Sequence, residues 1–245
     1  MVRIAALSDI HGNLWALEAV LADAKSLGVD LFVNLGDVLS GPLEPVGTAE
    51  LLMSLGWPTI AGNHERQLLA CAQGPGGPSD QFAFERTTAA QRAWLSALPA
   101  TLEVAEGVFL CHGTPQDDRT YFLDEVAEGW LRLASAVRVE AHASGIDQGL
   151  LLCGHSHQPR VVGLGDGRLV VNPGSVGLQA FDDDRPGAHA SETGSPHARY
   201  AICQRGPSGW TVELRAVAYE HRRAAAVARE NGRADWSKWL ELGRA

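Results

Sequence analysis

Short apolar runs, each closed by glycine or a polar residue, alternate with helical spacing along the first half of the chain. The runs have the length and the bounding residues of buried strands. Three of them come first, at residues 2–8, 31–35 and 57–61. Helical spacing extends from Leu14 to about Leu27, where Gly28 is a suitable stop, and recurs over 48–55 and from His64 to about Ala72. This rhythm predicts an α/β fold whose first strands are parallel.

The second half of the chain has a pattern rich in strands. A loop over 74–79, rich in glycine and proline, precedes a predicted helix over 88–98. Seven further strands are expected, at residues 101–104, 108–111, 150–153, 160–164, 168–171, 200–203 and 210–217. A helix from about Glu128 to Ala143 interrupts them, and two helical stretches close the chain. The polar segment 179–196 is expected to be a long surface loop.

Length and composition suit one globular domain over residues 1–245, since 45% of the 245 residues are hydrophobic and 20% are charged. Lys and Arg number 20 against 29 Asp and Glu, which gives a formal charge of −9. This acidic balance argues against a partner that is a nucleic-acid polymer, because such binding depends on neutralising phosphates. A small phosphorylated substrate remains compatible, because bound divalent cations reverse the local field.

The cysteines and the apolar segments predict a soluble cytoplasmic protein. The four cysteines are widely spaced and form no CxxC pair, so we expect buried free thiols. The first residues form a strand rather than a signal peptide, and no apolar stretch approaches the roughly 20 residues of a membrane helix. Trp236 and Trp239, near the C-terminus, are expected to pack onto the sheet rather than form an interface. The oligomeric state stays open.

Polar clusters close nearly every one of the predicted strands. They are Ser8-Asp9-Ile10-His11-Gly12-Asn13, Gly36-Asp37, Gly62-Asn63-His64-Glu65, Cys111-His112-Gly113 and Gly154-His155-Ser156-His157. Open α/β sheets gather their sites at the carboxyl ends of strands, so we expect these side chains to converge. Asp, Asn and His without thiolate suit borderline-to-hard ions in a catalytic centre, whereas a structural zinc favours four closed ligands that usually include Cys. Asp37 is a natural bridge, because one carboxylate offers an oxygen to each of two ions.

Each cluster taken alone has an ordinary structural explanation, since Asp, Asn and Gly are turn residues. Five clusters in one order, each closing a strand, are hard to attribute to turns. Asn13 is expected to cap the following helix, Glu65 to suit a first helical turn, and Asn172 to be structural. The histidines without partner spacing are expected to be solvated: His142, His189, His197 and His221.

These motifs, in this order, resemble the calcineurin-like metallophosphoesterase superfamily. The resemblance extends from Ile4 to about Gly177 and includes Asn172-Pro173-Gly174-Ser175-Val176-Gly177, which is similar to the Asn-Pro-Gly-Ser signature of the small bacterial and archaeal phosphodiesterase branch. It implies a mixed α/β fold, a four-layer β-sandwich of two mixed sheets flanked by helices.

The resemblance also implies a role for each motif position. The first ion would be held by Asp9, His11 and His157 and the second by Asn63, His112 and His155, with Asp37 as the bridge. His64 would be the catalytic histidine that protonates or electrostatically supports the leaving oxygen. A hydroxide bridging the two ions would be the nucleophile. The cofactors implied are two divalent ions, Mn first, with Fe, Zn, Ni or Mg as alternatives.

The function expected is a metal-dependent phosphoric ester hydrolase that acts on a small phosphodiester or a nucleotide. A phosphomonoesterase or a dinucleoside polyphosphate hydrolase is the alternative, because the same metal core serves either. A non-catalytic scaffold on this fold would lack ligands or the catalytic histidine, which are intact here. Protein Ser/Thr phosphatases carry an Asp-Arg pair shortly after the bridging Asp, whereas Val38-Leu39-Ser40-Gly41-Pro42 follows Asp37. The segment 179–196 departs from the small branch and is expected to lie near the cleft.

Overall fold

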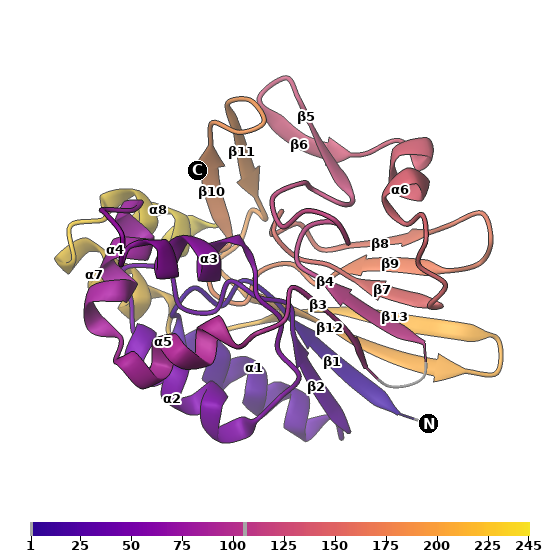
Figure 1. Ribbon diagram of the computed structural model, residues 1–245, viewed down its shortest axis with the longest axis horizontal. Coiled ribbons are helices and arrows are strands. Elements are labelled where there is room, and N and C mark those ends of the chain that lie inside the picture. Colours follow the sequence, from indigo (N-terminus) through magenta and orange to yellow (C-terminus); the bar gives the residue numbers. More distant parts are fainter. Residues whose placement is uncertain (1, 105–106) are drawn as a thin grey trace.

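Two mixed sheets form the central layers of the computed structural model, which describes residues 2–104 and 107–245. The strands of the first sheet are β1 (Arg3–Leu7), β2 (Leu31–Asn34), β12 (Ala198–Gly206) and β13 (Gly209–Val217). Those of the second are β3 (Thr101–Val104), β4 (Val108–Cys111), β7 (Leu150–Leu152), β8 (Arg160–Gly163) and β9 (Leu169–Asn172). The strand orders are β13-β12-β1-β2 and β3-β4-β7-β9-β8 (Figure 1). In each sheet parallel pairs lie beside antiparallel ones.

After Arg3, every residue of β1 is apolar because both faces of the strand are buried. Side chains alternate between the two faces of a strand. Ile4 and Ala6 pack between the two sheets, against residues of the second sheet such as Leu110. Ala5 and Leu7 belong instead to the core that the sheet shares with the helices. The unbroken apolar run of β1 therefore follows from its central place in the sandwich.

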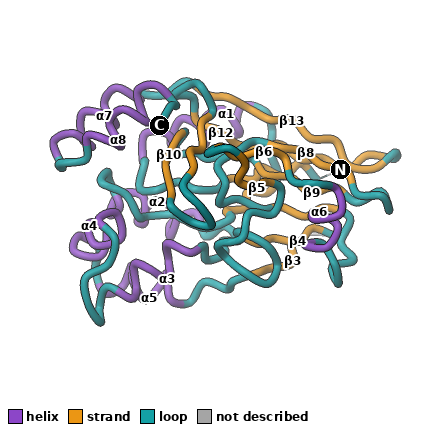
Figure 2. Tube along the Cα trace, turned by 90° about the horizontal axis from the view of Figure 1, so that it is seen from above, coloured by secondary structure: helices purple, strands orange, loops and turns teal. Residues whose placement is uncertain are grey.

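Helices cover the outer faces of both sheets. Their bounds are α1 (Leu14–Ser26), α2 (Pro45–Leu55), α3 (Asn63–Ala70), α4 (Pro78–Arg86), α5 (Ala89–Ser96), α6 (Ala136–His142), α7 (His221–Glu230) and α8 (Ala234–Leu242). The core on the first sheet includes apolar residues of α1 to α5, and α6 packs through Val139 on the second sheet. Figure 2 shows α7 and α8 on one side, and α3, α4 and α5 on the other, at the same end of the molecule. The predicted sandwich of two mixed sheets flanked by helices is confirmed.

A third, smaller sheet corrects two sequence predictions. It contains β5 (Asp124–Ala127), β6 (Trp130–Leu133), β10 (Ala180–Asp183) and β11 (His189–Glu192), in the order β10-β11-β6-β5. The predicted helix from Glu128 to Ala143 is wrong over its first half, because Glu128 and Gly129 form a two-residue hairpin turn. Their φ values are 54° and 78°, as tight hairpins of this kind require. The prediction of a surface loop over 179–196 is likewise wrong, because this segment contains the antiparallel strands β10 and β11.

Two shorter segments also differ from the predictions. The run 57–61 makes only an isolated bridge between Asn34 and Thr59, and Pro58 has no N–H with which to extend a ladder. The loop predicted over 74–79 ends early, because Pro78 begins the helix α4, where its fixed φ suits the first turn. The four cysteines are free and buried, as predicted. Among the described residues, no helix combines the length and the apolar character that a membrane crossing requires.

Candidate metal centre

The seven predicted metal ligands come together at the carboxyl ends of strands in both sheets. Donor atoms of one group, Asp9, His11 and His157, lie within 4.8 Å of one another, as do those of Asp37, His112 and His155. Asn63 joins the second group, because its Oδ1 lies 3.1 Å from Nε2 of His112. The grouping is the one that the family resemblance implies. The binding of ions by these residues stays a prediction.

A strained backbone conformation is common to most of these residues. Six non-glycine residues have positive φ in the described chain, and five of them are candidate ligands with φ between 53° and 65°: Asp9, His11, Asp37, His155 and His157. An L-residue in this left-handed region costs roughly 1–2 kcal/mol. Such strain persists only where the surroundings enforce it, and it gathers at functional sites.

Hydrogen bonds to backbone carbonyls fix the orientation of three of the imidazoles. The Nδ1 atoms of His11, His112 and His157 each lie 2.7 Å from a carbonyl oxygen, of Ser40, Leu35 and Leu178 respectively. A carbonyl only accepts, so each Nδ1 carries a hydrogen and each Nε2 is directed into the centre. His155 is turned the other way. Its Nε2 donates to the carbonyl of Arg119 at 2.9 Å, which leaves Nδ1 for an ion.

The histidines differ in charge when no metal ion is present. Burial, together with the charge of His157, lowers the pKa of His11 to about 4. Burial also lowers the pKa of His155 to about 3, so both rings are neutral and offer a lone pair. For His112, burial lowers the pKa, but the charge and hydrogen bond of Asp37 outweigh it and raise the pKa to about 10. A metal ion at His112 would therefore displace a proton.

The buried donors at the first group fit a cation. Nε2 of His11 and Nε2 of His157 lie 3.3 Å apart, so a proton or an ion must lie between them. Asp9 is fully buried and its Oδ1 has no hydrogen-bond partner among the described residues. This oxygen is 3.3 Å from Nε2 of His157. A buried carboxylate oxygen without a partner is costly, and a divalent ion would satisfy it.

Glu65 holds the loop that carries Asp37. Its buried carboxylate accepts hydrogen bonds from the N–H groups of Asp37 (2.8 Å), Val38 (2.8 Å) and Gly62 (2.7 Å). Burial and the charge of Asp37 raise the pKa of Glu65 to about 7, against the effect of these three donors. The predicted place of Glu65 in a first helical turn is confirmed, since it forms the capping box of α3. The sequence did not indicate that Glu65 also accepts hydrogen bonds from the loop after β2.

His64 lies at the edge of the centre and is paired with an acid. Its backbone N–H donates to Oδ1 of Asp37 at 2.9 Å, and its Nδ1 lies 2.7 Å from Oδ1 of Asp80. Burial lowers the pKa of His64, but Asp37, Asp80 and Glu65 outweigh it and raise the pKa to about 9. Sequence reasoning missed Asp80, because it lies in the first turn of α4, within a stretch read partly as loop.

The Asn-Pro-Gly-Ser segment ties two ligand loops together. Asn172 donates to the carbonyl of Gly154 at 2.7 Å, and the hydroxyl of Ser175 donates to the carbonyl of Asp9 at 2.8 Å. A Cβ at Gly177 would lie 1.7 Å from the carbonyl oxygen of Ile10, so only glycine allows this approach. The structural role expected of Asn172 is thus confirmed.

Other sequence predictions around the site have mixed outcomes. Asn13 caps α1, as predicted, by accepting from the N–H of Ala16 at 3.2 Å. Trp236 and Trp239 are buried in a cluster that includes Ala180 of β10, so the sheet onto which they pack is the third, smaller one. They line a cleft of about 270 Å³ with His11, Asp37, His64, His155 and His157. The prediction for His189 is wrong, since its ring is buried and its Nε2 lies 2.9 Å from the hydroxyl of Tyr121.

Comparison with known proteins gives matches over nearly the whole chain. A model of the calcineurin-like phosphoesterase superfamily domain matches residues 2–193. An uncharacterized protein of Methanocaldococcus jannaschii is 26% identical over 260 residues, which cover 98% of this chain and 98% of that protein. The crystal structure of a metallophosphoesterase from Sphaerobacter thermophilus has a TM-score of 0.75 at 25% identity, over 99% of both chains. A hypothetical protein of Pyrococcus horikoshii has a TM-score of 0.76 at 19% identity, again over 99% of both.

Replacing Glu65 by Gln should loosen the loop of Asp37. The amide nitrogen of Gln would face a backbone N–H that now meets an oxygen, which leaves a buried donor unpaired at a cost of about 1–3 kcal/mol. We expect E65Q to lower the melting temperature and to weaken Mn²⁺ binding, measured by thermal unfolding and calorimetric titration at pH 8. The control is E18Q on the exposed face of α1. Equal melting temperatures for E65Q and E18Q would refute this role.

Proposed function

Because the chain belongs to the calcineurin-like phosphoesterase superfamily and is a metal-dependent phosphoric ester hydrolase, we propose that it uses two divalent ions to hydrolyse a small phosphodiester or a nucleotide. The observation that carries this proposal is the pair of donor groups within one centre, each with two imidazoles and one carboxylate. Asp37 belongs to the second group, with its Oδ2 3.1 Å from Nε2 of His112. Its proposed role as bridge rests on the family, and on the ability of one carboxylate to offer an oxygen to each of two ions.

The two donor groups support the proposed ligands. Asp9, His11 and His157 would hold the first ion, Asn63, His112 and His155 would hold the second, and Asp37 would be shared by both. When bound, two such ions lower the pKa of water and neutralise charge on the phosphate oxygens. Imidazole nitrogens mixed with carboxylates suit Mn, Fe, Zn or Ni better than Mg, and Mn is the first choice for reconstitution.

His64 supplies the proton for the leaving oxygen in this proposal. Asp80 occupies Nδ1, so Nε2 of His64 is the atom left for the substrate. The same ion pair favours the protonated ring, as the raised pKa of about 9 indicates. A protonated imidazole donates a proton to a departing alkoxide and balances its charge. Asp80 acts as a positioning residue, because it contacts His64 and no reacting atom.

Space on two sides of the centre favours a diester over a monoester. His155 lines the cleft of about 270 Å³ and also a neighbouring cavity of about 570 Å³. A phosphodiester carries two substituents, and each requires room beside the phosphate. A phosphomonoesterase or a dinucleoside polyphosphate hydrolase is the alternative proposal.

The ratio of kcat/KM for bis-p-nitrophenyl phosphate to that for p-nitrophenyl phosphate tests the substrate class. The protein should be stripped of metal and reloaded with Mn²⁺. We expect a ratio well above one, because both cavities then take a nitrophenyl group. A ratio well below one would replace the diesterase by the phosphomonoesterase. No hydrolysis of either ester with any divalent ion would refute the proposal as a whole.

Substitution of His64 should lower kcat most for substrates whose leaving group is a strong base. Nitrophenolate leaves without a proton, whereas an alkoxide needs one, so general acid catalysis contributes about 10²–10⁴-fold only in the second case. We expect H64Q to lower kcat far more for an alkyl diester than for bis-p-nitrophenyl phosphate, and D80N to show a weaker form of the same pattern. An equal loss of kcat for both substrates would contradict the acid role of His64.

A further inference from the structure

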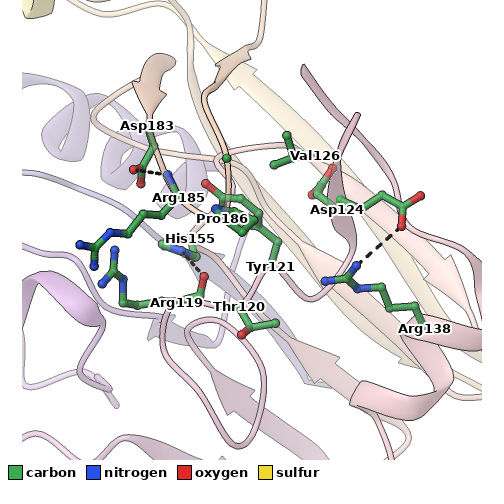
Figure 3. A pocket seen from close by; sticks show the side chains of 12 residues that line it. Arg119, Thr120, Tyr121, Asp124, Val126, Arg138, His155, Asp183, Arg185 and Pro186 are labelled. Carbon is green, nitrogen blue, oxygen red and sulfur yellow. Dashed lines mark hydrogen bonds and ion pairs between the residues drawn. The ribbon is translucent and has the colours of Figure 1, made fainter. Parts of the chain in front are cut away.

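A large cavity adjoins the candidate metal centre on one side of His155. It has a volume of about 570 Å³, within the range of small-molecule sites. Its walls come from the loop after β4, from β5, and from the turn between β10 and β11 (Figure 3). His155 and Asp183 line both this cavity and the cleft of the metal centre. A substrate at the ions can therefore extend into the cavity.

Three of the six Asp, Glu and Arg side chains that line this cavity are in ion pairs. Asp124 lies 2.6 Å from Nη2 of Arg160, and Arg138 lies 3.8 Å from the carboxylate of Glu125. Oδ1 of Asp183 accepts the backbone N–H of the Arg two residues on, at 3.0 Å. The two ion pairs neutralise Asp124 and Glu125, whereas Asp183 keeps its charge, because a backbone N–H is neutral.

Two arginines that line the cavity, Arg119 and Arg185, are not in these ion pairs. The guanidinium groups of Arg119 and Arg185 form no hydrogen bond and no ion pair with any described residue. Figure 3 shows both side chains extending past His155 in the same direction. Like charges brought to one place repel unless an anion lies between them. Among the acids that line the cavity, Asp183 is the one without an ion-pair partner in the described chain, so it and the two guanidinium groups together leave one net positive charge in the lining.

We propose that Arg119 and Arg185 bind a second phosphate group of the substrate, beyond the one that is hydrolysed. The planar guanidinium offers paired N–H donors that match phosphate oxygens, and two of them form a clamp for a dianion. The substrate class is then a nucleotide diester with a further phosphate. This inference rests on the proposed function, since it places the scissile phosphate at the metal centre.

The backbone of Arg119 is hydrogen-bonded to a residue of the candidate metal centre. Its carbonyl accepts the Nε2 hydrogen of His155, a candidate ligand, at 2.9 Å. The same loop is closed by Asp117, whose Oδ1 accepts the N–H groups of Arg119 and Thr120 at 2.9 Å and 2.7 Å. The backbone that carries this guanidinium is therefore held beside the candidate metal ligand His155, while the guanidinium has no partner among the described residues.

Two matched esters test the inference on the Mn²⁺-loaded protein. One is the p-nitrophenyl ester of thymidine 5′-phosphate, and the other is the same ester with an added 3′-phosphate. We expect the wild type to prefer the second ester. In R119Q/R185Q the ratio of the two kcat/KM values should fall about tenfold or more, mainly through KM, because charged hydrogen bonds to the second phosphate are lost. The control is R205Q/R222Q, which removes two exposed arginines that do not line the cavity.

The outcomes separate this inference from the function on which it rests. Hydrolysis of the first ester by the wild type supports the diesterase, whatever the arginines do. If the wild type shows no preference for the second ester, or if the ratio is the same in R119Q/R185Q and in the control, the two arginines are solvated surface charges and the inference is wrong. If neither ester is hydrolysed, the diesterase proposal fails and the inference fails with it.

Discussion

The rest of the structure depends on one constraint. Carboxylate oxygens and imidazole nitrogens are buried close together at the ends of strands. Oδ1 of Asp9 accepts no hydrogen bond from the described residues, and Nε2 of His11 lies 3.3 Å from Nε2 of His157. Such an arrangement is unfavourable in a buried site unless cations or protons lie between the donors. The polar cluster is therefore stabilised by bound positive charge, and the fold holds the cluster in place.

Maintaining the cluster costs conformational energy. Five left-handed residues at roughly 1–2 kcal/mol each amount to a strain comparable to the net stability of a domain, about 5–15 kcal/mol. Hydrogen bonds between the loops offset it. Glu65 accepts three backbone N–H groups, and Ser175 reaches the carbonyl of Asp9 across the sandwich. The motif residues that are not ligands thus keep the ligand loops in their strained form.

The ligand set could be predicted from the sequence because each motif directly follows a strand, and strand ends meet at one edge of a sheet. The pairing of His64 with Asp80 could not be predicted from the sequence, because the two residues meet only through the packing of α4 against α3. Arg119 and Arg185 were missed for the same reason, because they come from loops 66 residues apart that meet only in the folded chain. The secondary structure was predicted wrongly where residues that favour a turn lie inside a segment with helical spacing of apolar residues. At Glu128-Gly129, two residues with positive φ convert an expected helix into a hairpin.

We propose that two ions share this centre through Asp37. An anomalous difference map from crystals grown with Mn²⁺, with data collected on both sides of the manganese absorption edge, tests it directly. We expect two peaks about 3.5–4 Å apart, with Asp37 contacting both and the two donor groups divided between them. A single peak, or two peaks of which only one contacts Asp37, would contradict it.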